Sequence, residues 1–279
     1  MPRKDDPKLI TGPETISTSL LKETTVLVTR PENQSGDLTS QLEQRGATVI
    51  HCPTIEIAPP RDWESVDRAI ATIASYNWLV FTSANGARYF FDRFEERESR
   101  PFQKLSPLAI CTIGPATARA VEAIGAPVDL IVKDSRAEGV LRALIDHEGG
   151  PARIRGQRFL IPCARHARDF LPGELRKLAA QVDVVEAYQT LKPNVDLVGL
   201  LALRKIDVIT FTSPSTVSNF ARLAGTQLFA DLANKTIAAC IGPVTVAAAN
   251  DQGFRRIVQA ESATTQALVV SIARAIGNT

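Results

Sequence analysis

An excess of charge of either sign is the first thing that this sequence lacks. Its 279 residues include 32 lysines and arginines against 30 aspartates and glutamates, which gives a net charge of +2. This balance offers no bulk attraction for a polyanion, so we expect no nucleic-acid partner, and an anionic ligand has to be bound by local geometry. The length is typical of two domains, each large enough to bury a core.

Metal-ligand spacings and long apolar runs are absent as well. The three histidines and four cysteines show no CxxC pair and no zinc-type spacing, so we expect no metal and interpret the cysteines as small buried thiols. No apolar run approaches the ~18 residues that span a bilayer, and no signal peptide is recognised. We therefore expect a cytoplasmic protein without a membrane partner, in which residues 1–23 form a mobile tail.

Three catalytic fingerprints are also missing. The chain has no GxGxxG motif and no P-loop, which argues against a nucleotide-dependent Rossmann enzyme. It has no GxSxG nucleophile elbow, which argues against a serine hydrolase. The sequence therefore carries no signature of a cofactor.

What the sequence does contain is a regular alternation of strand-like and helix-like segments. Short apolar runs such as 26–29, 78–82 and 208–212 alternate with segments of helical spacing such as 62–75. This alternation predicts an α/β fold with parallel sheets that carry helices on both faces.

A buried strand, an Ile-Gly-Pro turn and a helix occur twice in this order, around 113–118 and around 241–246. Proline suits the first turn of a helix, and the free N–H groups there, together with the helix dipole, form a site for anions. Phe-Thr-Ser also occurs twice, at 81–83 and 211–213, so the units recur in the same order about 130 positions later. We interpret this pattern as the duplication of a Rossmann-like half.

Ligands of open parallel sheets bind at the carboxyl ends of the strands, where this chain places Arg30, Ser83, Gly114, Ser213 and Gly242. If the two domains face each other, these ends line a cleft that is rich in helix N-termini. Such a cleft is suited to a ligand with several carboxylates or phosphates.

Six motifs, in this order and spacing, give the chain a resemblance to uroporphyrinogen-III synthase over about residues 24–279. They are Val-Leu-Val-Thr-Arg-Pro (26–31), Phe-Thr-Ser-Ala-Asn-Gly (81–86), Ile-Gly-Pro-Ala-Thr-Ala (113–118), Tyr-Gln-Thr (188–190), Phe-Thr-Ser-Pro-Ser (211–215) and Ile-Gly-Pro-Val-Thr (241–245). Each motif alone is weak, but six in register make a specific match.

The resemblance implies an enzyme of tetrapyrrole biosynthesis, which leads to haem, sirohaem and cobalamin. Enzymes of this family cyclise hydroxymethylbilane to uroporphyrinogen III. The terminal hydroxyl is lost as water, the last pyrrole ring is inverted through a spiro intermediate, and the macrocycle closes. The resemblance therefore implies a lyase without metal or cofactor, which we expect to act as a monomer on this small-molecule substrate.

The resemblance also implies two Rossmann-like (flavodoxin-like) domains, joined by a two-stranded linker that the chain crosses twice. Its parts would be domain 1 at 24–52 and 193–279, domain 2 at 59–187, and the linker at 53–58 and 188–192. A tandem duplication alone would instead place the boundary near Gly149 and Gly150. Two connectors would permit a hinge motion between the domains.

Tyr188 lies in the family's Tyr-x-Thr motif and is the catalytic candidate, because a phenol can donate a hydrogen bond or a proton to the departing hydroxyl. The alternative is a tyrosine that anchors the linker by packing. The substrate-binding candidates lie at strand ends and helix starts, where capping or simple surface exposure is the alternative role. These candidates are Arg30, Ser83, Ala84, Thr117, Arg168, Ser213, Pro214, Val244 and Thr245.

Two readings other than an enzyme remain open at this point. The chain could be a two-domain binding protein without catalysis, or a regulatory protein of the same fold. An appended helix-turn-helix or a transmembrane segment would favour the second reading, and neither is recognised in 1–23 or after 276.

Overall fold

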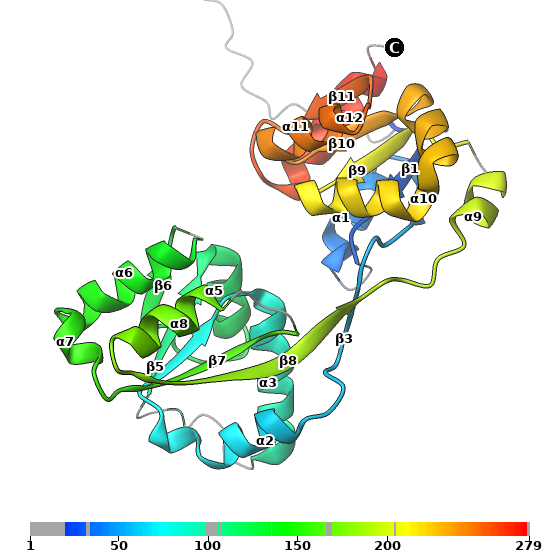
Figure 1. Ribbon diagram of the computed structural model, residues 1–279. Helices are drawn as coiled ribbons and strands as arrows, with labels where there is room; N and C mark the ends of the chain where they lie inside the picture. Colours follow the sequence, from blue (N-terminus) through cyan, green and yellow to red (C-terminus); the bar gives the residue numbers. More distant parts are fainter. Residues whose placement is uncertain are drawn as a thin grey trace, which may run out of the picture. The chain divides into compact units, whose positions relative to one another are not determined.

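The computed structural model describes residues 20–31, 34–98, 105, 108–134, 136–165, 169–203 and 205–277. The chain divides into two compact units, each with a sheet of its own (Figure 1). Unit 1 comprises Met1–Ile55 and Lys192–Thr279, and unit 2 comprises Glu56–Leu191. Most of the segment expected to be a mobile tail lies outside the described residues, but Leu21 is fully buried in the core of unit 1.

Unit 1 contains a five-stranded parallel sheet in the order β11-β10-β9-β1-β2. Its strands are β1 (Thr25–Val28), β2 (Thr48–His51), β9 (Val208–Phe211), β10 (Ile237–Cys240) and β11 (Arg256–Gln259). Its helices are α1 (Gly36–Glu43), α9 (Leu197–Leu203), α10 (Pro214–Lys235), α11 (Pro243–Asp251) and α12 (Thr265–Gly277). Numbered within the unit, the strand order is 2-1-3-4-5, which is the flavodoxin-like order.

Successive side chains of the central strands of unit 1 enter two different cores. Val26 and Val28 belong to a cluster with buried residues of α1 and α12, whereas Leu27 belongs to a cluster with residues of α10 and α11. Both faces of the sheet are therefore covered, which explains why the sequences of these strands are continuously apolar.

Unit 2 contains a six-stranded sheet in the order β3-β8-β7-β4-β5-β6. Its strands are β3 (Glu56–Ala58), β4 (Trp78–Phe81), β5 (Ala109–Ile113), β6 (Leu130–Val132), β7 (Arg158–Ala164) and β8 (Gln181–Leu191). Its helices are α2 (Glu64–Ala71), α3 (Ala84–Arg97), α5 (Gly114–Glu122), α6 (Ala137–Glu148), α7 (Pro151–Ile154) and α8 (Phe170–Lys177). The five strands from β4 to β8 are parallel and follow the Rossmann order 3-2-1-4-5.

The two faces of this sheet also have separate cores. Leu79 and Phe81 of β4 pack with residues of α2, α3 and α5, and Trp78 and Val80 pack with residues of α6 and α8. The α/β architecture with parallel sheets that the alternating sequence pattern predicts is confirmed.

The edge strand β3 pairs with the end of β8 in antiparallel fashion. Ile57 lies opposite Thr190, and Gln189 donates a side-chain hydrogen bond to the carbonyl of Pro59 at 2.9 Å. This pair occupies much of 53–58 and 188–192, the two segments in which we expect the linker. In unit 2, β8 lies next to β7 and β3 lies outside β8, so the pair forms one edge of the six-stranded sheet.

All four cysteines are free and buried, as the sequence predicts. Burial raises the pKa of Cys52, Cys111 and Cys240 to about 12 and that of Cys163 to about 11, which keeps the thiols protonated. Among the described helices, none is both long and apolar enough to span a membrane.

A bidentate ion pair joins α2 to α3. The guanidinium of Arg93 donates to both carboxylate oxygens of Asp67, at 2.8 and 2.7 Å. These hydrogen bonds lower the pKa of Asp67, so the pair stabilises the fold above the ordinary carboxylate pKa and the gain is lost as the pH falls through the lowered value. The pair matters for the site described below, because it holds the helix that starts at that site.

We expect Arg93→Met to lower the free energy of unfolding by about 1–2 kcal/mol at pH 7. The difference should narrow as the pH falls to 3, where protonation of Asp67 weakens the pair, and leave a remainder from the contact of Arg93 with the Trp63 ring. Urea unfolding at both pH values measures this. The control is Arg68→Met, whose partner Glu64 is exposed, with an expected effect of about 0.5 kcal/mol or less. A difference that stays constant with pH would contradict the assignment.

Candidate functional site

The carboxyl end of β4 leads directly into helix α3 through Ser83. The Ser83 side chain accepts a hydrogen bond from the N–H of Gly86 at 3.1 Å, so it is the N-cap of the helix. Ala84 is the first helical residue, and both Ser83 and Ala84 are half-buried. Gly86 lies so close to the backbone of β7 that an added Cβ would be 3.0 Å from the carbonyl oxygen of Pro162. Glycine therefore allows the helix to start tight against the sheet.

Tyr188 meets Ser83 at this point. The Tyr188 and Ser83 hydroxyl oxygens are 3.1 Å apart, and the tyrosine ring is 9% exposed at the edge of the core. The structure thus brings together the catalytic candidate and one substrate-binding candidate, which are separated by 105 positions in the sequence. Either hydroxyl can donate in this hydrogen bond.

A register shift in β8 turns the side chain of Tyr188 toward Ser83. Along the pairing of β7 with β8, Cys163 lies opposite Glu186, but Ala164 lies opposite Tyr188. The extra residue is Ala187, as in a β-bulge, and it turns Tyr188 to the face of α3, away from the face of Glu186. Regular alternation would have placed Tyr188 and Glu186 on the same face, and no motif in the sequence signals this shift.

Tyr89, which the sequence analysis did not select, packs against Tyr188. The two rings are stacked with centroids 6.1 Å apart and an interplanar angle of 17°. The Tyr89 hydroxyl donates to the carbonyl of Ile57 in β3 at 3.0 Å. Tyr89 lies on α3, six positions after the N-cap Ser83, and nothing in the sequence indicates that its ring contacts that of Tyr188.

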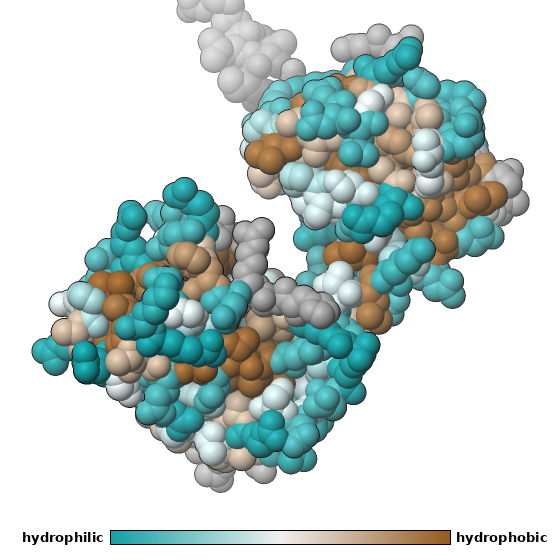
Figure 2. Space-filling view, viewed as in Figure 1, coloured by the Kyte–Doolittle hydropathy of each residue, from teal (hydrophilic) through white to brown (hydrophobic). Residues whose placement is uncertain are grey.

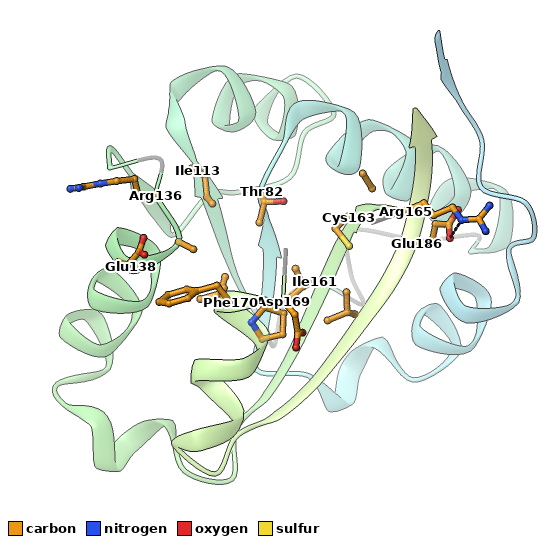
Figure 3. A pocket seen from close by; sticks show the side chains of 15 residues that line it. Thr82, Ile113, Arg136, Glu138, Ile161, Cys163, Arg165, Asp169, Phe170 and Glu186 are labelled. Atoms are coloured by element: carbon orange, nitrogen blue, oxygen red, sulfur yellow. Dashed lines mark ion pairs between the residues drawn. The ribbon is translucent and has the colours of Figure 1, made fainter. Parts of the chain in front are cut away.

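A cavity of about 800 Å³ opens on the other face of the same strand ends (Figure 3). Thr82, Ile113 and Ala164 line it at the ends of β4, β5 and β7. Figure 3 shows Arg136 and Glu138 at one end of the cavity and Arg165 and Glu186 at the other. The volume lies in the range of small-molecule sites.

The cavity combines apolar walls with charged ends. Phe170 and Val184 line it and are each 40% exposed, and Figure 2 shows apolar surface on this face of unit 2, over β8 and α8. At one end, Arg165 lies 4.0 Å from Glu186 and the pair is about 30% exposed. One carboxylate oxygen of Glu186 is buried with no hydrogen-bond partner among the described residues. The cavity can therefore receive a group that is apolar in its body and polar at its edges.

The Ile-Gly-Pro turn of unit 2 forms the start of α5. The helix spans Gly114–Glu122 with Pro115 in its first turn, and Gly114 has a φ of 75°, a left-handed conformation that favours glycine. Pro115 and Ala116 are exposed, but the side chain of Thr117 is 4% exposed. The first-turn backbone of this helix is thus accessible, while the threonine points toward the core.

In unit 1 the same edge carries the starts of α10 and α11. Ser213 accepts from the N–H of Thr216 at 3.3 Å and its own N–H donates to the Thr216 hydroxyl at 3.3 Å, which is a capping box. Pro214 follows as the first residue of α10. At the start of α11, Val244 is 70% exposed, whereas Thr245 is 3% exposed. Ser213 and Pro214 thus serve the start of α10 itself, whereas at α11 Val244 is exposed and Thr245 is buried.

Arg30 follows β1 at the same edge and is half-buried. Burial lowers the pKa of its guanidinium, and the charge of Asp37 acts in the opposite direction. A partly desolvated guanidinium of this kind gains from a further anion.

The candidates thus fall into two groups, one in each unit. Unit 2 places Ser83, Ala84, Thr117 and Tyr188 at the carboxyl edge of its sheet, and unit 1 places Arg30, Ser213, Pro214, Val244 and Thr245 at the corresponding edge. Arg168 lies outside the described residues. No group of three or more His, Cys, Asp or Glu side chains that could hold a metal ion occurs in the described part of the chain.

Comparisons with known proteins identify a family that matches most of the chain. The family model described as uroporphyrinogen-III synthase HemD matches residues 36–270. The uroporphyrinogen-III synthase of Synechococcus elongatus is 33% identical over 255 residues, which cover 89% of this chain and 94% of that protein. That of Chlorobaculum parvum is 28% identical over 235 residues, which cover 83% and 90% of the two chains.

Two solved structures share the fold. A mutant uroporphyrinogen III synthase from the extremely thermophilic bacterium Thermus thermophilus has a TM-score of 0.61 at 16% identity, covering 92% of this chain and 100% of that one. The synthetase from Helicobacter pylori has a TM-score of 0.57 at 14% identity, covering 91% and 99%.

Proposed function

Because the chain belongs to the uroporphyrinogen-III synthase family, we propose that it cyclises hydroxymethylbilane to uroporphyrinogen III. The observation that carries this proposal is the match to the Synechococcus elongatus enzyme, which extends over 94% of that enzyme at 33% identity. A non-catalytic binding or regulatory protein is not favoured, since the relatives described above are named as synthases. We propose further that the enzyme is a lyase, that it acts as a monomer and that it is cytoplasmic.

The first chemical step is the loss of the terminal hydroxyl. We assign Tyr188 the role of proton donor: its phenol gives a proton to the hydroxyl oxygen, the carbon–oxygen bond breaks, and the electron pair leaves on water. The position of the Tyr188 hydroxyl supports this, because it lies at the carboxyl edge of the sheet beside Ser83. Ser83 already accepts the N–H of Gly86, so its own proton is free to be donated to the tyrosine oxygen, which would leave the phenol proton for the substrate.

The later steps depend on holding the chain of four pyrroles in a fixed shape. The electron-deficient carbon left by the hydroxyl is attacked by the substituted carbon of the last ring, which gives the spiro intermediate. The bond from this carbon to its original methylene then breaks, and that methylene bonds to the unsubstituted carbon of the same ring, so that the ring is inverted. The proton lost from that carbon balances the proton that the phenol gave in the first step. We propose that the helix starts at Ser83, Gly114, Ser213 and Pro243, with Arg30, bind the acetate and propionate groups. The accessible first turns of α5 and α11 support this role. Such catalysis works mainly by positioning.

The test is the isomer that the purified chain produces. Hydroxymethylbilane closes without an enzyme to the type I isomer, so we expect type III with the folded chain and type I with the heat-denatured chain as control. Chromatographic separation of the two isomers measures the ratio. Formation of type I alone by the folded chain would overturn the proposed function.

A further inference from the structure

Tyr188 lies near the end of β8, where Gln189 is half-buried and Thr190 and Leu191 are exposed. Its backbone still pairs with β7, because Ala164 lies opposite it and the N–H of Arg165 donates to the Tyr188 carbonyl at 3.0 Å. The three residues that follow pair with the short strand β3. This pairing fixes the backbone of Tyr188, and the position of its hydroxyl then depends on what the ring contacts.

We propose that Tyr89 is a positioning residue for Tyr188, an inference that rests on the proposed role of Tyr188 as proton donor. The stacked ring of Tyr89 limits rotation of the Tyr188 ring and thereby keeps its hydroxyl 3.1 Å from the Ser83 hydroxyl. Tyr89 can do this because its backbone belongs to helix α3, which fixes the place of the ring.

Tyr89 acts through its neighbour and not on the substrate. Its hydroxyl proton is committed to a backbone carbonyl, so it is not a second proton donor. The ring also contacts the guanidinium of Arg88, whose central carbon is 5.2 Å from the ring centroid. Through its hydroxyl and its ring, Tyr89 thus links α3 to β3 and to the end of β8.

The test is a double-mutant cycle on turnover. Tyr89→Leu removes the ring and is expected to lower kcat by roughly three- to tenfold, the range of an aromatic pair, with KM changed less than twofold. In the Tyr188→Phe background the same change is expected to lower kcat less than twofold, because no phenol proton remains to be positioned. Tyr89→Phe keeps the ring and is the matched control, with a kcat within about twofold of the wild type.

The possible outcomes distinguish a failure of the positioning role from a failure of the proposed function. An equal loss of kcat from Tyr89→Leu in both backgrounds would show a general structural role and overturn positioning. A loss in Tyr89→Phe as large as in Tyr89→Leu would also overturn it, since the stack would not be what matters. Failure of the wild-type chain to make the type III isomer would instead overturn the proposed function, and is read from the isomer ratio before any variant is compared.

Discussion

Replacing Tyr188 with phenylalanine is expected to lower the turnover of hydroxymethylbilane by about tenfold to a hundredfold. General acid catalysis is typically worth about 10²- to 10⁴-fold. The expected loss lies at or below the lower end of this range, because the benzylic-type hydroxyl of the linear substrate leaves readily even without an acid. A slower enzyme also leaves more time for spontaneous closure, so the fraction of type I isomer should rise. Steady-state kinetics and the isomer ratio measure the two effects.

The control for this substitution is Tyr76→Phe in the same unit. The Tyr76 hydroxyl donates to Asp183 at 2.6 Å, and burial raises its pKa to about 12, so it is a structural phenol of comparable burial. We expect Tyr76→Phe to leave turnover unchanged. Tyr188→Phe should cost about 1 kcal/mol of stability or less, since it removes one hydroxyl–hydroxyl contact. Unchanged turnover in Tyr188→Phe would remove the phenol from the mechanism.

Much of the architecture could be predicted from the sequence because it depends on local patterns. Apolar runs such as Trp78–Phe81 alternate with amphipathic helices. A short run that is apolar throughout is enough to indicate a parallel strand buried on both faces. The helix starts at Ser83 and Ser213 were also recognisable, because an N-cap serine interacts within three residues. Local rules of this kind leave the partners across the sheet undetermined.

The arrangement around Tyr188 could not be predicted, because it depends on a single extra residue in a strand. Ala187 adds the register shift that turns Tyr188 toward Ser83, and the shift arises from the pairing of β7 with β8 and not from a turn motif. Tyr89 was missed for a related reason. Tyr89 is the sixth residue of α3, and from the sequence alone it is indistinguishable from any half-buried aromatic residue on a helix. Its role becomes visible only with its partner ring, Tyr188.

The two threonines after the Gly-Pro turns show a different limit. Thr117 and Thr245 are 4% and 3% exposed, so their side chains lie toward the cores while the preceding residues are exposed. The sequence indicates a polar residue near an anion-ready helix start, but it does not indicate on which side of the helix that residue lies. That the two threonines contact the substrate stays a prediction. The residues that precede them in each first helical turn are better exposed than the threonines themselves.

The duplicated Phe-Thr-Ser motif provides the largest expected effect on stability. Phe81 ends β4 fully buried, with its ring centroid 5.8 Å from that of Phe90 and 5.3 Å from that of Phe91. Phe211 ends β9 in the same way, 5.8 Å from Phe220 and 5.4 Å from Phe254. Each ring fills the core of its own unit, so replacing either with alanine should lower the free energy of unfolding of that unit by about 3–5 kcal/mol.

Tryptophan fluorescence can assign each loss to its unit, because both tryptophans of the chain, Trp63 and Trp78, lie in unit 2. In urea, Phe81→Ala should move the fluorescence transition to lower concentration. Phe211→Ala, the matched control, should leave that transition in place and move only the part of the far-ultraviolet circular dichroism change that belongs to unit 1. This expectation follows because the hydrophobic clusters of the two units share no residue. A fluorescence shift of equal size in both variants would show instead that the two units unfold as one cooperative body.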